Sequence, residues 1–378
     1  MTMSVALITP DRPPTIPNCE RGLKWNFQPK RAPQELQLGL SEILRAFPAR
    51  FDFDSSAISL RFEPWQNPGE GLRIARISDD EIEVRYSQPC EAFRAFGILM
   101  GQTESGQAPS PLAENPVFTS IGALVDVSRN GVLRIDMVEK LIRHLALMGF
   151  NQLMLYTEDT YAIPGEPLFG YFRGGYSQEE LRGIDTYASH FGIEVVPCIQ
   201  TLGHLEQVLQ WPAYSALKDT DGVLMAGNTE VEALIERMLI AASAPFRSRR
   251  IHVGMDEAHG IGAGRYRLHN GLRPPFEILA GHLEKVSAMC SRLGLQPMIW
   301  SDMFFRLGSK NNQYYDRNTV IPPGVDARIP ADVDLVYWDY YHTDSAFYDD
   351  WIARHRALGK EPVFAAGIWT WNRMWAAL

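Results

Sequence analysis

Seven short apolar segments, most of them separated by amphipathic helical patterns, dominate the chain from residue 121 onward. The segments are 121–127, 152–157, 193–199, 250–255, 296–301, 333–340 and 362–369. The helical patterns cover 134–149, 177–192, 229–244, 274–294 and 344–359. Near-continuous apolar strands that alternate with helices indicate a parallel sheet covered by helices. Seven such units in a row favour an α/β fold of the (β/α)₈ barrel type over an open sheet.

The first third of the chain has a different pattern. Residues 34–47 and 90–102 show helical spacing, and 58–64 and 71–88 alternate apolar with polar residues as half-buried strands do. The stretch 103–116 is rich in Pro, Ser and Gly, which is typical of a domain boundary. We therefore expect a loose segment at 1–21, a small α+β domain at 22–115 and a barrel at 116–378.

The composition of the chain argues against several classes of function. The formal net charge of -9 gives no help to nucleic-acid or anionic-membrane binding, which both need basic patches. No segment approaches the length of a membrane span, and Pro10 and Pro13 interrupt the short apolar run at the N-terminus. The four cysteines are far apart, as expected of free thiols in a reducing compartment. We expect a cytoplasmic protein with no membrane, nucleic-acid or cofactor partner.

The most informative local motif is RIHVGMDEAHGIGAGRY, residues 250–266. An apolar strand runs into two adjacent carboxylates, Asp256 and Glu257, and then into a glycine-rich loop. At a strand end both side chains can turn toward one pocket. Two neighbouring carboxylates disfavour joint ionisation, which can leave one of them protonated as a general acid requires. The alternative is an ordinary acidic loop or a helix N-cap.

A histidine and two more carboxylates follow neighbouring strands. His204 lies in the loop after the third apolar segment, and Glu158 and Asp159 follow the second. A carboxylate–histidine pair beside an acid could hold its geometry and tune its pKa. A metal site built from His204, Asp256 and Glu158 is the competing interpretation, although a second histidine with ligand spacing is missing. We therefore expect no metal.

Aromatic and acidic residues gather at the ends of the later strands. They are Trp300, Asp302, Trp338, Asp339, Tyr340, Trp369 and Trp371. Large aromatics are mostly buried, so core packing is the plain interpretation of any single one. Tryptophans at the ends of three strands also suit a pocket whose flat walls pack against the C–H faces of a sugar ring.

These motifs together resemble glycoside hydrolase family 20, the β-N-acetylhexosaminidases. The likeness rests on HVGMDEAHGIG with YTED and TLGH before it, and on VDVSRNG, WSDMF, YWDYYH and GIWTWNR. The likeness spans about residues 120–373, and this region is similar to the family's smaller branch. The α+β region before it is similar, more weakly, to the domain that precedes the barrel in this family.

The resemblance implies a retaining exo-hydrolase of N-acetylglucosamine or N-acetylgalactosamine that works by substrate-assisted catalysis. Glu257 would be the acid and base, and Asp256 would orient the 2-acetamido group that attacks the anomeric carbon. His204 with Glu158 or Asp159 would support Glu257. Tyr340 would donate to the acetamido oxygen, and Trp300, Trp338 and Trp369 would wall the pocket.

Two departures from the family pattern qualify this reading. Where many members have an arginine that binds sugar hydroxyls, this chain has Ile121, so that contact must come from elsewhere or be absent. The family also continues into an eighth strand, whereas the last apolar segment here is the seventh. We expect a barrel incomplete at its C-terminus, whose open edges favour a homo-oligomer. The alternatives are a catalytically weak carbohydrate-binding barrel and a metal-dependent barrel hydrolase.

Overall fold

The computed structural model describes residues 24–51, 57–67, 69–129, 131–367 and 371. The chain divides into two compact units, residues 1–117 with 147–149 and residues 118–146 with 150–378. The stretch 103–116, expected as a polar boundary, contributes a short strand, β5 (Leu112–Glu114). No helix in the described part of the chain is long and apolar enough to cross a membrane.

The smaller unit is a mixed sheet with two helices. Its strands, in sheet order, are β1 (Trp25–Asn26), β2 (Ile58–Pro64), β4 (Glu81–Tyr86), β3 (Leu72–Arg76) and β5. Strands β1, β2 and β4 run parallel, and β3 is antiparallel to both β4 and β5. The helices are α1 (Gln37–Ala46) and α2 (Pro89–Glu104). Helix α2 begins where Gln88 and Glu91 form a capping box ahead of its apolar residues.

The larger unit contains a seven-stranded parallel sheet in the order β14-β13-β12-β11-β8-β7-β6. The strands are β6 (Gly122–Asp126), β7 (Gln152–Tyr156), β8 (Glu194–Cys198), β11 (Arg250–His252), β12 (Gln296–Trp300), β13 (Asp334–Trp338) and β14 (Val363–Ala365). All neighbouring pairs are parallel. This arrangement confirms the predicted fold class, a (β/α)₈ barrel that is incomplete within the described residues, with β6 and β14 as its edges.

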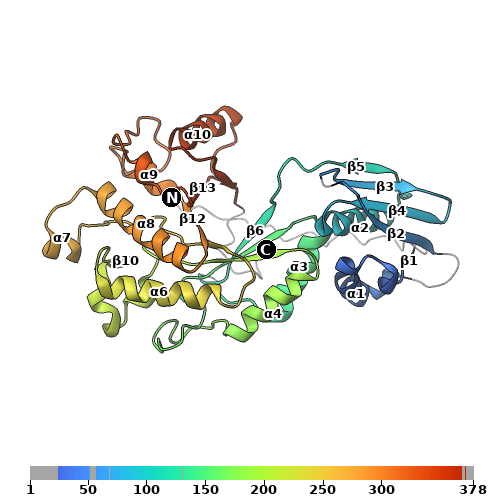
Figure 1. The fold of residues 1–378 in the computed structure, drawn as a ribbon, viewed down its shortest axis with the longest axis horizontal. Coiled ribbons are helices and arrows are strands. Elements are labelled where there is room, and N and C mark those ends of the chain that lie inside the picture. Colours follow the sequence, from blue (N-terminus) through green and yellow to red (C-terminus); the bar gives the residue numbers. More distant parts are fainter. Residues whose placement is uncertain (1–23, 52–56, 68, 130, 368–370, 372–378) are drawn as a thin grey trace, which may run out of the picture. The chain divides into compact units, whose positions relative to one another are not determined.

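Long helices connect these strands, as the 3.6-residue apolar spacing predicts. They are α3 (Ile135–Leu147), α4 (Gln178–Ser189), α6 (Thr229–Ser243), α8 (Pro275–Arg292) and α10 (Ser345–Ala357). Figure 1 shows α3, α4, α6 and α8 lining one side of the sheet. Ser177 caps α4 with a capping box, and the Asn228 side chain accepts two backbone N–H groups at the start of α6.

Several short elements at the strand ends have no clear sequence pattern. They are α5 (Glu206–Leu209), β9 (Lys218–Thr220), β10 (Val223–Leu224), α7 (Arg265–Asn270) and α9 (Asp302–Arg306). In the β9–β10 hairpin, Asp219 accepts backbone N–H groups of Gly262, Gly264 and Tyr266. A buried carboxylate of the hairpin therefore fixes the glycine-rich loop that follows Glu257.

The inner face of the sheet is filled by large side chains from alternate strand positions. One buried cluster consists of Met154, Tyr156, Val196, Cys198, Met298, Trp300, Val336 and Trp338. These residues come from β7, β8, β12 and β13, so they pack beneath any site at the strand ends.

Candidate functional site

A pocket of about 500 Å³ includes the carboxyl ends of several strands and extends along β6 as far as Gly122. Its polar lining includes Asp126, Arg129, Asp256 and Glu257. Its aromatic lining comprises Phe150, Tyr156, Trp300, Trp338, Tyr340, Tyr341 and Trp371. A concave site with apolar walls and a few converging polar groups is typical of a small-ligand pocket.

The predicted carboxylate pair and the predicted histidine meet at this pocket. His204 Nε2 lies 3.1 Å from Asp256 Oδ2 and 3.3 Å from Glu257 Oε2. A single imidazole nitrogen therefore bridges the two carboxylates. The strand ends explain the meeting, because β8 and β11 are direct neighbours in the sheet.

Asp256 is fixed at both of its oxygens. The Gln200 amide donates to Asp256 Oδ1 at 2.7 Å, and His204 contacts the other oxygen. Gln200 also donates to the Tyr156 hydroxyl and accepts the backbone N–H of Met255. A carboxylate bound in this way has little freedom to rotate, which suits an orienting role better than nucleophilic attack.

Glu257 is held by a different set of groups. The Tyr314 hydroxyl donates to Glu257 Oε1 at 2.7 Å. Asp302 Oδ2 accepts the backbone N–H of Glu257 at 3.1 Å, and Asp302 Oδ1 accepts the indole N–H of Trp338 at 3.3 Å. Asp302 is fully buried, so it acts behind the site rather than in the pocket.

The backbone around the pair is strained. His204, Met255 and Glu257 have positive φ values of 54°, 73° and 46°, in a region that residues other than glycine rarely adopt. A Cβ on Gly203 would lie 2.6 Å from the carbonyl oxygen of Asp256, so only glycine fits before His204. Strain of this kind persists where surrounding contacts enforce it, and it is concentrated at functional sites. The strand β11 ends at His252, three residues short of the predicted strand end.

The two carboxylates favour the protonated form of His204. Burial alone would lower the pKa of His204, but Asp256 and Glu257 outweigh it and raise that pKa to about 11. Burial would raise the pKa of Asp256, whereas His204 and Gln200 lower it to about 2. Hydrogen bonds from His204 and Tyr314 lower the pKa of Glu257 against the effect of burial. The pKa values of both carboxylates are therefore lowered by the histidine that bridges them, which differs from the expectation that one of the two retains a proton.

Arg129 contributes a cation to the lining of the pocket, which Ile121 cannot do. Ile121 precedes β6, at the opposite end of the strand from the carboxylates, whereas Arg129 follows the strand's carboxyl end. Its Nε lies 2.8 Å from Asp126 Oδ2 and 3.5 Å from Glu158 Oε1. Burial raises the pKa of Glu158 to about 7, although Arg129 acts in the opposite direction.

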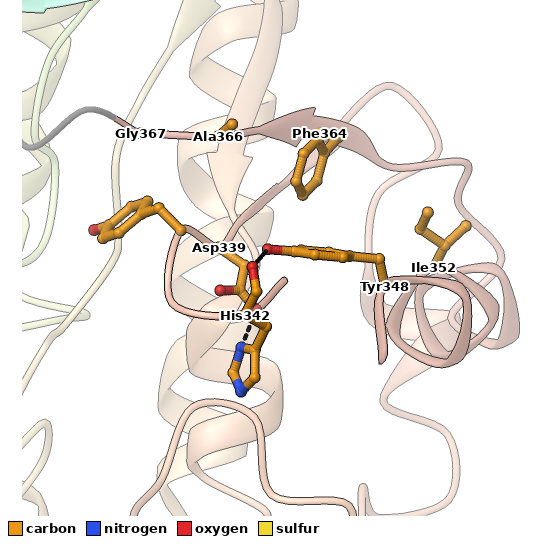
Figure 2. Close-up of a pocket in the computed structure, with 8 residues that line it drawn as sticks. Asp339, His342, Tyr348, Ile352, Phe364, Ala366 and Gly367 are labelled. Atoms are coloured by element: carbon orange, nitrogen blue, oxygen red, sulfur yellow. Dashed lines mark hydrogen bonds and ion pairs between the residues drawn. The ribbon is translucent and has the colours of Figure 1, made fainter. Parts of the chain in front are cut away.

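Two of the predicted acidic residues point away from the pocket. Asp159 pairs with Arg173 at 3.1 Å and does not contact His204. Asp339 lies in a separate cavity of about 330 Å³ between β13, α10 and β14 (Figure 2). There it accepts His342 Nδ1 at 2.8 Å and the Tyr337 hydroxyl at 3.2 Å.

The predicted aromatic walls are largely brought together. Trp300, Trp338, Tyr340 and Trp371 all line the main pocket. The rings of Trp338 and Tyr340 stack with centroids 5.4 Å apart, and Tyr340 and Trp371 lie 4.9 Å apart. Trp369 lies outside the described residues.

Several residues of the site had no predicted role, among them Gln200, Tyr314 and Arg129. Gln200 and Arg129 follow strand ends, which is the signal that could have identified them. Tyr314 lies between α9 and β13, far from any strand end in sequence, and no pattern marks it.

One group in the described part of the chain has a geometry that could hold a metal ion. It comprises His204, Asp256 and Glu257, whose ligand atoms lie within 4.8 Å of one another. Glu158, which the metal interpretation included, does not belong to this group. A bound metal would have to displace the proton that His204 holds between the carboxylates. The absence of a metal therefore stays a prediction.

Comparison with known proteins agrees with this geometry. The family model of the glycosyl hydrolase family 20 catalytic domain matches residues 118–322, more than half of the chain. Hexosaminidase D from Homo sapiens is 26% identical over 205 residues, which are 51% of this chain and 39% of the human protein. The chain therefore spans well under two thirds of the length of that relative.

Solved structures show the same fold. One is the family 20 exo-β-N-acetylglucosaminidase from Vibrio harveyi in complex with N-acetylglucosamine, with a TM-score of 0.65 and 17% identity. The match covers 91% of this chain and 56% of that one. Another is the β-N-acetylhexosaminidase from Streptomyces coelicolor, with a TM-score of 0.63, 17% identity and coverage of 92% and 72%. With the family model matched over most of the barrel, the chain belongs to glycosyl hydrolase family 20.

Proposed function

We propose that this protein is an exo-β-N-acetylhexosaminidase that removes terminal N-acetylglucosamine or N-acetylgalactosamine from glycans. The observation that carries the proposal is the adjacent pair Asp256 and Glu257, bridged by His204 beside an aromatic-walled pocket. The relatives named above are hexosaminidases, and the walls suit the apolar faces of one sugar ring.

The nucleophile is the carbonyl oxygen of the substrate's own 2-acetamido group. Asp256 is poorly suited to attack, because Gln200 and His204 occupy both of its oxygens. Each of these oxygens keeps a second lone pair, so Asp256 can accept the acetamido N–H and balance positive charge on the oxazolinium ring that forms. An attacking group already attached to the sugar has a large proximity advantage.

Glu257 moves the protons. When a sugar covers its partly exposed side chain, loss of water raises the carboxyl pKa, and a proton can pass from His204. Glu257 protonates the glycosidic oxygen as the C1–O bond breaks, and the acetamido oxygen bonds to C1 to give an oxazolinium ion. Glu257 then takes a proton from a water molecule as the water oxygen attacks C1. This attack breaks the bond between C1 and the acetamido oxygen, so the oxazolinium ring opens and the sugar is released with retained configuration.

Arg129 and the walls hold the sugar. The guanidinium, fixed by Asp126 and Glu158, can donate to ring hydroxyls from within the pocket. Trp300, Trp338 and Tyr340 pack against the ring, and the Tyr340 hydroxyl is our candidate donor to the acetamido oxygen. Asp302 and Asp339 act from behind these walls.

The test is hydrolysis of 4-nitrophenyl N-acetyl-β-glucosaminide and the corresponding galactosaminide. Glu257→Gln and Asp256→Asn, each of nearly unchanged size, should lower turnover by about a hundredfold or more. A thiazoline mimic of the oxazolinium ion should inhibit. No hydrolysis of either substrate, together with binding of the free sugar, would instead indicate a carbohydrate-binding barrel.

Treatment with a chelator tests the remaining alternative, a metal-dependent hydrolase. If the cluster of His204, Asp256 and Glu257 works without a metal, exhaustive treatment with a chelator should leave kcat unchanged. Loss of activity that returns on addition of one divalent cation would favour a metal-dependent hydrolase.

A further inference from the structure

Three aromatic side chains form an exposed surface on the loops after β7 and β8. Tyr171 and Phe172 are 43% and 87% exposed, and Trp211 is partly exposed. Ring centroids lie 4.1 Å apart for Tyr171 and Phe172, and 5.3 Å apart for Tyr171 and Trp211. Single exposed apolar residues are ordinary, but three adjacent aromatic rings form a continuous apolar surface.

This surface is held in a fixed and strained conformation. Phe172 has a φ of 63°, which is costly for a bulky residue. Gly170 has a φ of 70°, and a Cβ there would lie 2.2 Å from the carbonyl oxygen of Asp159. Arg173 pairs with the buried Asp159 at 3.1 Å and donates to the backbone oxygen of Ser128. The exposure of Phe172 is therefore built into an anchored loop.

The anchors tie the loop that carries Tyr171 and Phe172 to the strand ends that also carry the candidate site. Ser128 immediately precedes Arg129, and its hydroxyl accepts the backbone N–H of Glu158 at 2.7 Å. The loop that carries Trp211 begins with Gln200 and His204, which contact Asp256. Both loops follow the carboxyl ends of parallel strands, the side on which barrels of this kind carry their sites.

We propose that Tyr171, Phe172 and Trp211 bind the second and third sugars of an oligosaccharide whose terminal N-acetylhexosamine occupies the pocket. This rests on the proposed function. Aromatic faces pack against the apolar faces of sugar rings, and the exposed amides of Gln207 and Gln210 beside Trp211 can bond hydroxyls. The substrate class is then a neutral oligosaccharide rather than a sugar on a small aglycone.

The experiment compares two substrates that share the terminal sugar. One is the β-1,4-linked trimer of N-acetylglucosamine, and the other is methyl N-acetyl-β-glucosaminide, which has no second sugar to contact the aromatic surface. Phe172→Ala should lower kcat/KM for the trimer about fivefold and leave the methyl glycoside unchanged. Phe172→Trp should retain wild-type activity on the trimer. Leu268→Ala, on an 82% exposed side chain of α7, is the matched control and should change neither substrate.

Equal effects of Phe172→Ala on both substrates, or no effect on the trimer, would overturn the proposal. So would a wild-type dimer that becomes a monomer in Phe172→Ala with unchanged trimer kinetics, since the surface would then bind a second copy. If neither substrate is hydrolysed, the proposed function fails, and calorimetric binding of the trimer decides this proposal separately. Binding that weakens in Phe172→Ala but not in Leu268→Ala supports it, and absent or unchanged binding contradicts it.

Discussion

His204 Nε2 lies 3.3 Å from Glu257 Oε2, within reach of a direct proton transfer. The same nitrogen contacts Asp256, and the two carboxylates raise the pKa of the imidazole to about 11. In the proposed mechanism, His204 would supply the proton that Glu257 needs when a leaving group arrives. The proposed acid function would then belong to the pair His204 and Glu257, and we expect the pair to titrate as one unit.

Replacing His204 by glutamine tests the proton store. Glutamine can still donate a hydrogen bond to a carboxylate, but it cannot release a proton to Glu257. We expect kcat to fall about a hundredfold with a smaller change in KM. His259→Gln is the matched control, because this exposed histidine lies two residues from Glu257. If His204→Gln keeps more than half of the wild-type kcat, the proton comes from elsewhere.

Gln200→Glu tests whether Asp256 must be ionised. The substitution replaces the amide donor at 2.7 Å by a carboxylate, so the pKa of Asp256 should rise from about 2. The acid limb of kcat/KM against pH should move upward. Gln200→Met removes the donor without adding charge, so its acid limb should move less. Superimposable pH profiles for the wild type and both variants would show that Gln200 does not control Asp256.

The sequence pattern predicts the barrel and the central triad because strand ends in a parallel sheet meet at one edge. Asp256, Glu257 and His204 each follow an apolar segment, so their meeting needs only the right topology. Which partner each side chain faces is a different matter. Asp159 and Glu158 are neighbours in sequence, yet Asp159 turns to Arg173 and Glu158 to Arg129.

Other features depend on contacts that no local pattern encodes. Tyr314 reaches Glu257 from 57 positions away, through a segment without periodicity. The acidic residues Asp302 and Asp339 do follow strand ends, but their burial behind the pocket depends on the indole of Trp338 and the side chain of His342. Strand pattern fixes position along the chain, whereas tertiary packing decides whether a polar side chain lines a pocket or supports its wall.

Asp302 should make stability depend on pH. Burial, followed by the charge of Asp256, raises its folded-state pKa to about 8 from an ordinary 3.8. The folded protein therefore binds this proton more tightly than the unfolded chain, and the stabilisation is lost as pH rises from about 4 through 8. Asp302→Asn stays neutral, so its thermal midpoint should fall less than that of the wild type over this range.

The control for this comparison is Asp349→Asn, an exposed aspartate on α10. Its midpoint should follow the wild-type curve. Parallel curves for the wild type and Asp302→Asn would mean that Asp302 is ionised in the folded protein.

Tyr314→Phe isolates the second donor to Glu257. The phenol donates to Glu257 Oε1 at 2.7 Å and lowers the pKa of that carboxyl together with His204. Without the hydroxyl, the carboxylate is less stabilised, so the shared proton of His204 and Glu257 is released at higher pH. The alkaline limb of kcat/KM should move upward while the acid limb, which reports Asp256, stays in place. Tyr315→Phe is the matched control, since the adjacent Tyr315 hydroxyl has no hydrogen-bond partner among the described residues. An acid limb that moves with the alkaline limb would mean that Tyr314 acts on the whole site rather than on Glu257.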